Sequence, residues 1–387
     1  MDSTRLSRRD FLKNAGLGAA FLAGIKFIPA SLQNQPSSQM QMGDFMPDAE
    51  VNITAAEKYV QILPGAKTRV WSYSGQLLWG NGVTVTNLTG NYLGPILRVK
   101  FGTKIRINFY NNLAEKSVIH PHGLRVPEDC DGQPMQAIDP GQLKVYDFQV
   151  IDRACPAWFH PHPMGLTAHQ VVMGMAGLFT VWDDEEAGIV PGAGTGANDI
   201  PVIIQDRSFD SNNQFYYQPN WMWGYLADRI LVNGKVNAAF SLEPRGYRLR
   251  FLNGSNARTY KLAWSNNMPL KVIGTDGGLL PAPVSRSYVM LMPGERVDIW
   301  ADFSKLAGSQ VILKSLSFDP GGMGGMGGGG RMGGGGGGCN CGGGGMNSAP
   351  SNGAAFNIMT VNVGRKATAS PVLGTSFPSL SVRYNSG

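Results

Sequence analysis

The stretch 104–109, Lys-Ile-Arg-Ile-Asn-Phe, alternates polar and apolar side chains with a period of two. The stretch 296–303 has the same pattern, with Val297, Ile299 and Ala301 among its apolar positions. Because the side chains of a strand point to opposite faces in turn, this pattern predicts strands with one buried face. Similar short runs, separated by Gly, Pro and Asn, lie at 96–99, 144–150, 177–182, 202–205, 248–252 and 311–316.

Many short strands and few helical signals place the chain in the all-β class. The best windows for a helical turn or two are 167–173 and 221–227. A Gly-rich break at 185–198 separates two strand-rich blocks of comparable length, 51–186 and 198–364. We therefore predict two β-sandwiches in tandem, preceded by an N-terminal linker at residues 31–50.

Composition narrows the class of protein further. The chain has 387 residues, of which 43% are hydrophobic and 16% are charged. This length suffices for two or three domains, and this composition excludes a disordered polyelectrolyte and a coiled coil. The formal net charge is +6, but Lys and Arg form no run and no basic helix. We therefore expect no nucleic-acid partner.

Residues 1–30 have the layout of an export signal. The paired Arg8 and Arg9 precede a weakly apolar stretch rich in Gly and Ala at 15–28. This pattern resembles the twin-arginine signal peptide, which implies cleavage near Ala30, recognition by the twin-arginine export machinery, and a periplasmic or otherwise exported location. The alternative is a membrane anchor, but a stretch interrupted by three glycines is too short and too polar to span comfortably.

The rest of the chain contains no segment of eighteen apolar residues, so we expect no membrane span after cleavage. It has only four cysteines, two of them within a glycine tract, which excludes a disulfide scaffold. Cys130 and Cys155 could form a disulfide in an oxidising compartment, and the sequence leaves that pairing open.

Histidine is unevenly distributed along the chain. All five histidines lie between 120 and 169, and four of them form the motifs His-Pro-His-Gly at 120–123 and His-Pro-His at 160–162. On a strand, residues i and i+2 share a face about 7 Å apart, so two facing strands would gather four imidazoles. Imidazole clusters suit copper or zinc better than magnesium or calcium. We therefore predict a metal site formed by His120, His122, His160 and His162.

These motifs resemble those of bacterial multicopper oxidases of the laccase and copper-efflux-oxidase type, and the resemblance covers nearly the whole chain after the signal peptide. It implies tandem cupredoxin-like Greek-key β-sandwiches, with the first cupredoxin domain at 51–186 and the second at 198–364. Beyond the histidines, it includes PILRV at 95–99, DGQP at 131–134, PG at 140–141, MGMAGL at 173–178, LVNGK at 231–235, RFLN at 250–253, TDGG at 275–278 and PGER at 293–296.

The resemblance also assigns roles to residues of the first block. It implies that His120 holds a type 2 copper ion, whereas His122, His160 and His162 hold a type 3 pair that binds dioxygen. Asp131 stands where the family has a carboxylate beside the copper cluster, and it would relay protons, since reduction of dioxygen to water consumes four protons. Asp131 also suits the ordinary role of a turn residue before Gly, so both roles stay open.

The family's type 1 copper, where electrons enter, needs a His-Cys-His signature that this sequence lacks. The resemblance places that signature, with further ligands of the cluster, in a third domain. We therefore interpret the chain as a truncated enzyme that cannot turn over alone, with 365–387 as the connector towards the missing domain. The second block contains no histidine and is expected to bind no copper. His169 matches no ligand position and is expected at the surface or behind the ligands.

A glycine tract at 321–346 interrupts the second block. Glycine loses the most conformational entropy on ordering, so we expect an inserted loop. Thioether and thiolate sulfurs favour Cu(I), so the insertion could capture cuprous ions as substrate. The alternative is a low-complexity loop with incidental methionines. The sulfur-bearing residues concerned are Met323, Met326, Met332, Cys339, Cys341 and Met346.

Three functions are compatible with these features. The leading hypothesis is an exported multicopper oxidase that couples one-electron oxidation of Cu(I) or a phenolic substrate to reduction of dioxygen to water. The alternatives are a non-catalytic scaffold, like division-associated relatives of the family, and a periplasmic copper-binding or storage protein. Retention of all four histidines of the two motifs argues against the scaffold.

Overall fold

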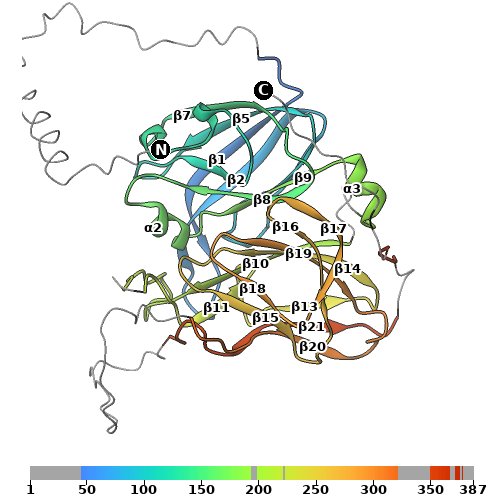
Figure 1. The fold of residues 1–387 in the computed structure, drawn as a ribbon. Coiled ribbons are helices and arrows are strands. Elements are labelled where there is room, and N and C mark those ends of the chain that lie inside the picture. The colour runs from blue at the N-terminus through green and yellow to red at the C-terminus, as the bar shows by residue number, and fades with distance from the viewer. Residues whose placement is uncertain are drawn as a thin grey trace, which may run out of the picture. The chain divides into compact units, whose positions relative to one another are not determined.

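The computed structural model describes residues 45–192, 198–220, 223–320, 349–366, 371–374 and 377. The chain divides into two compact units, Met1–Met46 and Pro47–Gly387. All helices and strands given below belong to the second unit. Strands dominate the described part of the chain, so the expected all-β class is confirmed (Figure 1).

The first sandwich consists of two sheets, drawn from blue to green in Figure 1. Apolar side chains of both sheets, including Ile53, Phe109 and Phe159, fill one core between them. The outer sheet has the order β2 (Thr68–Gly80), β1 (Ala49–Val60), β5 (Lys104–Asn111) and β7 (Leu143–Gln149). The interface sheet has the order β3 (Val83–Thr86), β4 (Ile96–Lys100), β9 (Gly177–Trp182), β8 (Cys155–Pro161) and β6 (Ile119–His122).

The second sandwich also has two sheets around one core, to which Phe251, Leu262 and Ile299 contribute. The facing sheet has the order β12 (Lys235–Val236), β11 (Arg229–Val232), β10 (Asp199–Arg207), β14 (Gly246–Asn253), β19 (Arg296–Asp302), β16 (Leu270–Thr275) and β17 (Gly278–Arg286). The other sheet has the order β13 (Ala239–Leu242), β21 (Phe356–Val363), β20 (Gln310–Ser315), β15 (Tyr260–Trp264) and β18 (Val289–Leu291).

Every run named in the sequence analysis coincides with a strand, although the runs 144–150, 296–303 and 311–316 each extend one residue past the end of theirs. The helical window at 167–173 is confirmed by α2 (Thr167–Val172), whereas the described part of the window at 221–227 contains no helix. The Gly-rich break begins with a short helix, α3 (Asp184–Ile189), which the sequence analysis did not predict. Two 3₁₀ turns, η3 (Glu128–Cys130) and η4 (Pro134–Gln136), follow β6. The domain boundaries at 51–186 and 198–364 stay predictions.

The two sandwiches pack against each other through the interface sheet and the facing sheet. Trp158 of β8 and Leu178 of β9 share a buried cluster with Ile203 of β10 and Leu252 of β14. Every residue of β8 is buried, because alternate side chains enter the core of the first sandwich and the contact with the second. At β8, the face of the interface sheet that points away from the first core is therefore covered by the second sandwich.

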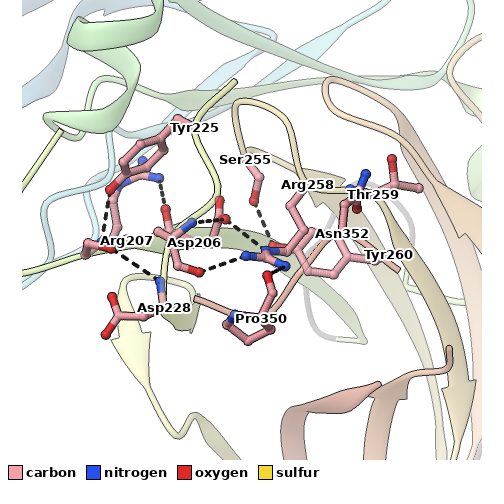
Figure 2. Close-up of polar contacts among 12 residues, drawn as sticks. Asp206, Arg207, Tyr225, Asp228, Ser255, Arg258, Thr259, Tyr260, Pro350 and Asn352 are labelled. Carbon is pink, nitrogen blue, oxygen red and sulfur yellow. Dashed lines mark hydrogen bonds and ion pairs between the residues drawn. The ribbon is translucent and has the colours of Figure 1, made fainter. Parts of the chain in front are cut away.

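A buried ion pair organises the second sandwich at the end of β10 (Figure 2). Arg258 and Asp206 are both fully buried, and Arg258 Nε donates to Asp206 Oδ2 at 2.9 Å. The remaining nitrogens of the guanidinium donate to the carbonyl oxygens of Ala227 at 2.8 Å and Pro350 at 2.9 Å. One arginine thus joins three segments of the chain that are distant in sequence.

Loss of the Arg258 guanidinium should destabilise the fold strongly. We expect Arg258→Met to lower the free energy of unfolding by about 3–5 kcal/mol, because it leaves the Asp206 carboxylate buried without its cation. Urea denaturation of the metal-free chain measures this loss. The matched control is Arg69→Met, since Arg69 and Glu57 are roughly half exposed and 3.5 Å apart, and such pairs contribute at most about 1 kcal/mol. Equal losses in the two variants would contradict the prediction.

Candidate metal centre

The two histidine motifs lie on neighbouring antiparallel strands of the interface sheet. In the β6–β8 ladder, His120 pairs with His160 and His122 pairs with Trp158. Ile119 and Phe159 enter the core, so the alternation of each strand turns the histidines to the opposite face. Pro121 fits because β6 is the edge strand, where a missing backbone N–H interrupts no interior ladder.

The structure brings the imidazoles of all four predicted ligands together. His122 Nδ1 lies 3.2 Å from His160 Nε2. One nitrogen from each of His120, His122 and His160 lies within 4.8 Å of the others. The ring centroid of His162 lies 5.3 Å from that of His120 and 6.0 Å from that of His160. The four rings thus lie near one another, with three of them in the group whose nitrogens lie within 4.8 Å of one another. The assignment of all four histidines as ligands and the binding of an ion stay predictions.

Hydrogen bonds fix which nitrogens of the cluster are free. A carbonyl oxygen can only accept, so His120 Nδ1–H donates to the carbonyl of Asp131 at 2.6 Å. For the same reason His160 Nδ1–H donates to the carbonyl of Pro161 at 2.9 Å. In both rings Nε2 is then the unprotonated nitrogen, which is how metal-binding imidazoles are oriented in proteins. In the metal-free chain His160 Nε2 can accept a hydrogen bond from His122 Nδ1–H at 3.2 Å, and an ion would replace that proton.

The gap between His122 Nδ1 and His160 Nε2 suits a metal ion. Two nitrogens 3.2 Å apart can both bind one ion at about 2.0–2.1 Å, a usual distance between a metal and an imidazole nitrogen. His162 Nδ1 is buried and has no hydrogen-bond partner among the described residues. An unpartnered buried nitrogen is costly, and binding of an ion by that nitrogen would relieve the cost. The donor set therefore fits a metal that prefers imidazole, such as copper.

The imidazoles of His160 and His122 are held neutral by their surroundings. Burial, with smaller contributions from the neighbouring imidazoles of His120 and His122, lowers the pKa of His160 to about 3. Burial also lowers the pKa of His122 to about 4, with a second contribution from the positive charge of Arg296. Metal ions bind neutral imidazole, so above about pH 4 protons do not compete for these two nitrogens.

Three residues outside the predicted set also shape the site. The Trp158 ring lies 4.3 Å from the His160 ring and 5.2 Å from the His122 ring, between centroids. From the second sandwich, Gly294 faces the His122 ring and Arg296 reaches the backbone at Gly123. The motif at 293–296 signalled membership of a family, but its spacing gave no indication of contact with residues far away in the sequence.

Asp131 ends the η3 turn and lies beside His120. Its Oδ1 is 3.5 Å from His120 Nδ1, and its side chain is 36% exposed. At the next residue, Gly132, φ is +69° and a Cβ would overlap the carbonyl oxygen of Ile119. Only glycine fits such a position. The turn role and the carboxylate beside the cluster thus both agree with the geometry, and the proton relay stays a prediction.

The remaining predicted residues lie elsewhere. His169 stands on α2, where its ring contacts Trp71 at 5.3 Å and Tyr217 at 5.6 Å between centroids, and the metal-ligand group above does not include it. Cys130 and Cys155 are buried free thiols, so the structure shows no disulfide between them. Outside the described residues lie the predicted export signal at 1–30 and the sulfur-bearing residues Met323, Met326, Met332, Cys339, Cys341 and Met346.

Comparison with known proteins identifies relatives of two kinds. Residues 76–186 match the family model described as multicopper oxidase. A multicopper oxidase of Staphylococcus haemolyticus is 41% identical over 224 residues, which cover 58% of this chain and 50% of the relative. The cell division protein FtsP of Escherichia coli is 32% identical over 311 residues, which cover 80% of this chain and 62% of the relative. The chain thus spans about half to two thirds of these relatives.

A solved structure also overlaps most of this chain. A variant of the multicopper oxidase McoA from Aquifex aeolicus superimposes with a TM-score of 0.71 and 30% sequence identity. The superposition covers 87% of this chain and 67% of that chain. Among the residues described here, no helix has the length and apolar character needed to cross a membrane.

Acidification should destabilise the metal-free chain through His160 and His122. Both pKa values lie below the ordinary 6.5, so between about pH 6.5 and pH 4 the unfolded chain binds more protons than the folded chain. The free energy of unfolding therefore decreases as the pH falls through this window. Urea denaturation at several pH values should show a shallower decrease for His160→Gln than for the wild type. Parallel curves for the two proteins would contradict the prediction.

Proposed function

The chain belongs to the multicopper oxidase family, and we propose that its four clustered imidazoles hold copper ions at which dioxygen is reduced to water. Its fold is the tandem cupredoxin-like Greek-key β-sandwich. The observation that carries the proposal is the 3.2 Å approach of His122 Nδ1 to His160 Nε2 on one face of β6 and β8. Two neutral nitrogens at that separation suit a divalent ion that prefers imidazole, such as Cu(II).

The four histidines and their neighbours would have different roles in the proposed centre. His120 would hold a type 2 ion, and His122, His160 and His162 would hold a type 3 pair. Copper, when bound, supplies one-electron redox chemistry and a binding site for dioxygen. The protein orients the imidazoles through the carbonyl groups of Asp131 and Pro161. Trp158 and the second sandwich cover the cluster from one side and limit the access of water.

Turnover requires a type 1 copper site, and these 387 residues contain no His-Cys-His signature. We therefore propose that the activity belongs to a longer protein that includes such a site. The substrate would be Cu(I) or a phenolic compound, oxidised one electron at a time. The sulfur-bearing insertion at 321–346 supports Cu(I), and the paired Arg8 and Arg9 support export by the twin-arginine route.

A second candidate is a structural role without turnover. The 32% identity over 311 residues to the cell division protein FtsP favours it. Copper content distinguishes the two candidates, because a scaffold needs no metal. A copper-binding or storage role without turnover is distinguished in turn by assays of cuprous and phenolic oxidation on the chain extended through any downstream coding sequence.

Copper binding should depend on the imidazoles that approach each other most closely. We expect the purified chain, loaded with Cu(II) and desalted, to retain copper, as measured by plasma mass spectrometry. His160→Ala should weaken copper binding by at least about 100-fold, because it removes one ligand and leaves His122 Nδ1 without the second nitrogen that would share its ion. The matched control is His169→Ala, which should retain wild-type copper. Copper-free wild-type protein would refute the proposed centre and favour the scaffold.

Replacement of the Asp131 carboxyl group should slow oxygen reduction without loss of copper. In the extended, copper-loaded chain we expect Asp131→Asn to reduce the rate of oxygen consumption by about 10²–10⁴-fold, the usual contribution of a positioned proton donor. The carbonyl of Asp131 still accepts from His120, so copper content should not change. Asp129→Asn, an exposed neighbour, is the control. A wild-type rate for Asp131→Asn would leave Asp131 with its turn role alone.

A further inference from the structure

Arg296 is a buried cation of the second sandwich that reaches the two strands of the histidine motifs. It begins β19 and is only 5% exposed. Its Nε donates to the carbonyl of Pro156 in β8 at 2.7 Å, and its Nη1 donates to the carbonyl of Gly294 at 3.0 Å. Its Nη1 also pairs with Asp276 Oδ1 at 2.9 Å. The planar guanidinium makes these contacts in different directions at once, which a lysine cannot do.

The other side of the Arg296 guanidinium lies against the glycine that ends the first histidine motif. Gly123 has φ +92°, and a Cβ there would collide with Arg296 Nη2. Only glycine permits both the left-handed backbone and this close approach. Gly294, with φ +80°, faces His122 in turn, because a Cβ there would lie 3.4 Å from His122 Cε1.

The contacts of Arg296 hold β6 and β8 together beyond the point where the backbone pairing between these strands ends. The β6–β8 pairing stops at His122 and Trp158. Just beyond, a Cβ at Gly123 would lie 3.8 Å from Cβ of Ala157, but the two residues are not paired in the ladder. Arg296 binds the carbonyl of Pro156 on β8 and packs on Gly123 after β6. It therefore spans the two strands at the end of the ladder where His122 lies opposite Trp158.

If Arg296 served only to hold the two sandwiches together, it would not need to lie beside the histidine motifs. Other contacts already join the sandwiches without residues of the histidine motifs, including Tyr92 Oη to Gln205 Oε1 at 2.7 Å and Arg207 Nη2 to the carbonyl of Val171 at 2.8 Å. The Arg296 guanidinium pairs with Asp276 at 2.9 Å, but its positive charge still lowers the pKa of His122, so electrostatics alone would not favour an arginine beside a bound cation. Its distinctive property is therefore geometric.

We propose that Arg296 is a positioning residue of the metal centre, holding the turn after His122 against β8 so that the nitrogens of His122 and His160 converge on one ion. The inference rests on the proposed function for the identity of the ion. It assigns the second sandwich, which has no histidine in the sequence, a direct part in forming the copper site.

The test compares Arg296→Gln and Arg296→Lys with Arg286→Gln, which removes an equal charge from the exposed end of β17. We expect both Arg296 variants to bind Cu(II) about 10–100-fold more weakly, as found when residues that orient metal ligands are replaced. The electron paramagnetic resonance spectrum of their bound Cu(II) should also change. Arg286→Gln should match the wild type in both measurements. Wild-type affinity in Arg296→Gln, or full rescue by lysine, would overturn the proposal.

A second measurement does not depend on copper. Diethyl pyrocarbonate modifies accessible neutral imidazoles, and fragmentation of the tryptic peptide between Lys116 and Arg125 separates His120 from His122. In the metal-free chain we expect His122 to react several-fold faster in Arg296→Gln than in the wild type, with His169 unchanged. Equal rates at His122 would overturn the positioning role. Copper-free wild-type protein would refute the proposed function, while this measurement still decides the role of Arg296.

Gly123→Ala serves if the Arg296 variants fail to fold. The added methyl group displaces the guanidinium from the turn and leaves the arginine in place. We expect the same loss of Cu(II) affinity as in Arg296→Gln, together with a lower thermal midpoint. Wild-type affinity in a folded Gly123→Ala protein would overturn the proposal.

Discussion

The complete burial of β8 is the constraint on which the proposed metal centre depends. Its alternate side chains serve two different cores, since Phe159 packs inside the first sandwich and Trp158 packs against the second. His160 lies on the same face of β8 as Trp158 and is therefore buried as well. The low dielectric there keeps the imidazole neutral and raises the cost of any unpartnered nitrogen. A strand exposed on one face would provide neither effect.

The sequence allowed the fold class and the four clustered histidines to be predicted, because both depend on local patterns. Period-two alternation identified β5 and β19, and the i, i+2 spacing put His120 beside His122 on one face. Sequence patterns failed where burial is two-sided. The run in β8 shows no alternation of polar and apolar residues, since both of its faces are covered. Only the His-Pro-His motif at 160–162 indicated that a strand lies there.

Long-range contacts account for the other residues that the sequence analysis missed. Arg296 and Gly294 border the cluster only because the facing sheet packs on the interface sheet. The helix α3 arises within a Gly-rich stretch, where its buried Glu186 forms an ion pair with Arg248 of β14 at 2.6 Å. No local sequence pattern predicts these contacts. Arg296 and Gly294 reach the histidines from the other sandwich, and the partner of Glu186 lies beyond the Gly-rich break at 185–198.

The state of the two described cysteines bears on when the metal can be acquired. Burial raises the pKa of both Cys130 and Cys155 to about 12, so in the folded chain they stay protonated and sealed within the core. Thiolates are the form of cysteine that attacks oxidants and captures soft ions. In the proposed copper-binding role, copper that reaches the folded chain meets imidazoles, whereas copper that reaches the unfolded chain also meets thiolates. Folding first, and metallation second, is the order that keeps these sulfurs intact.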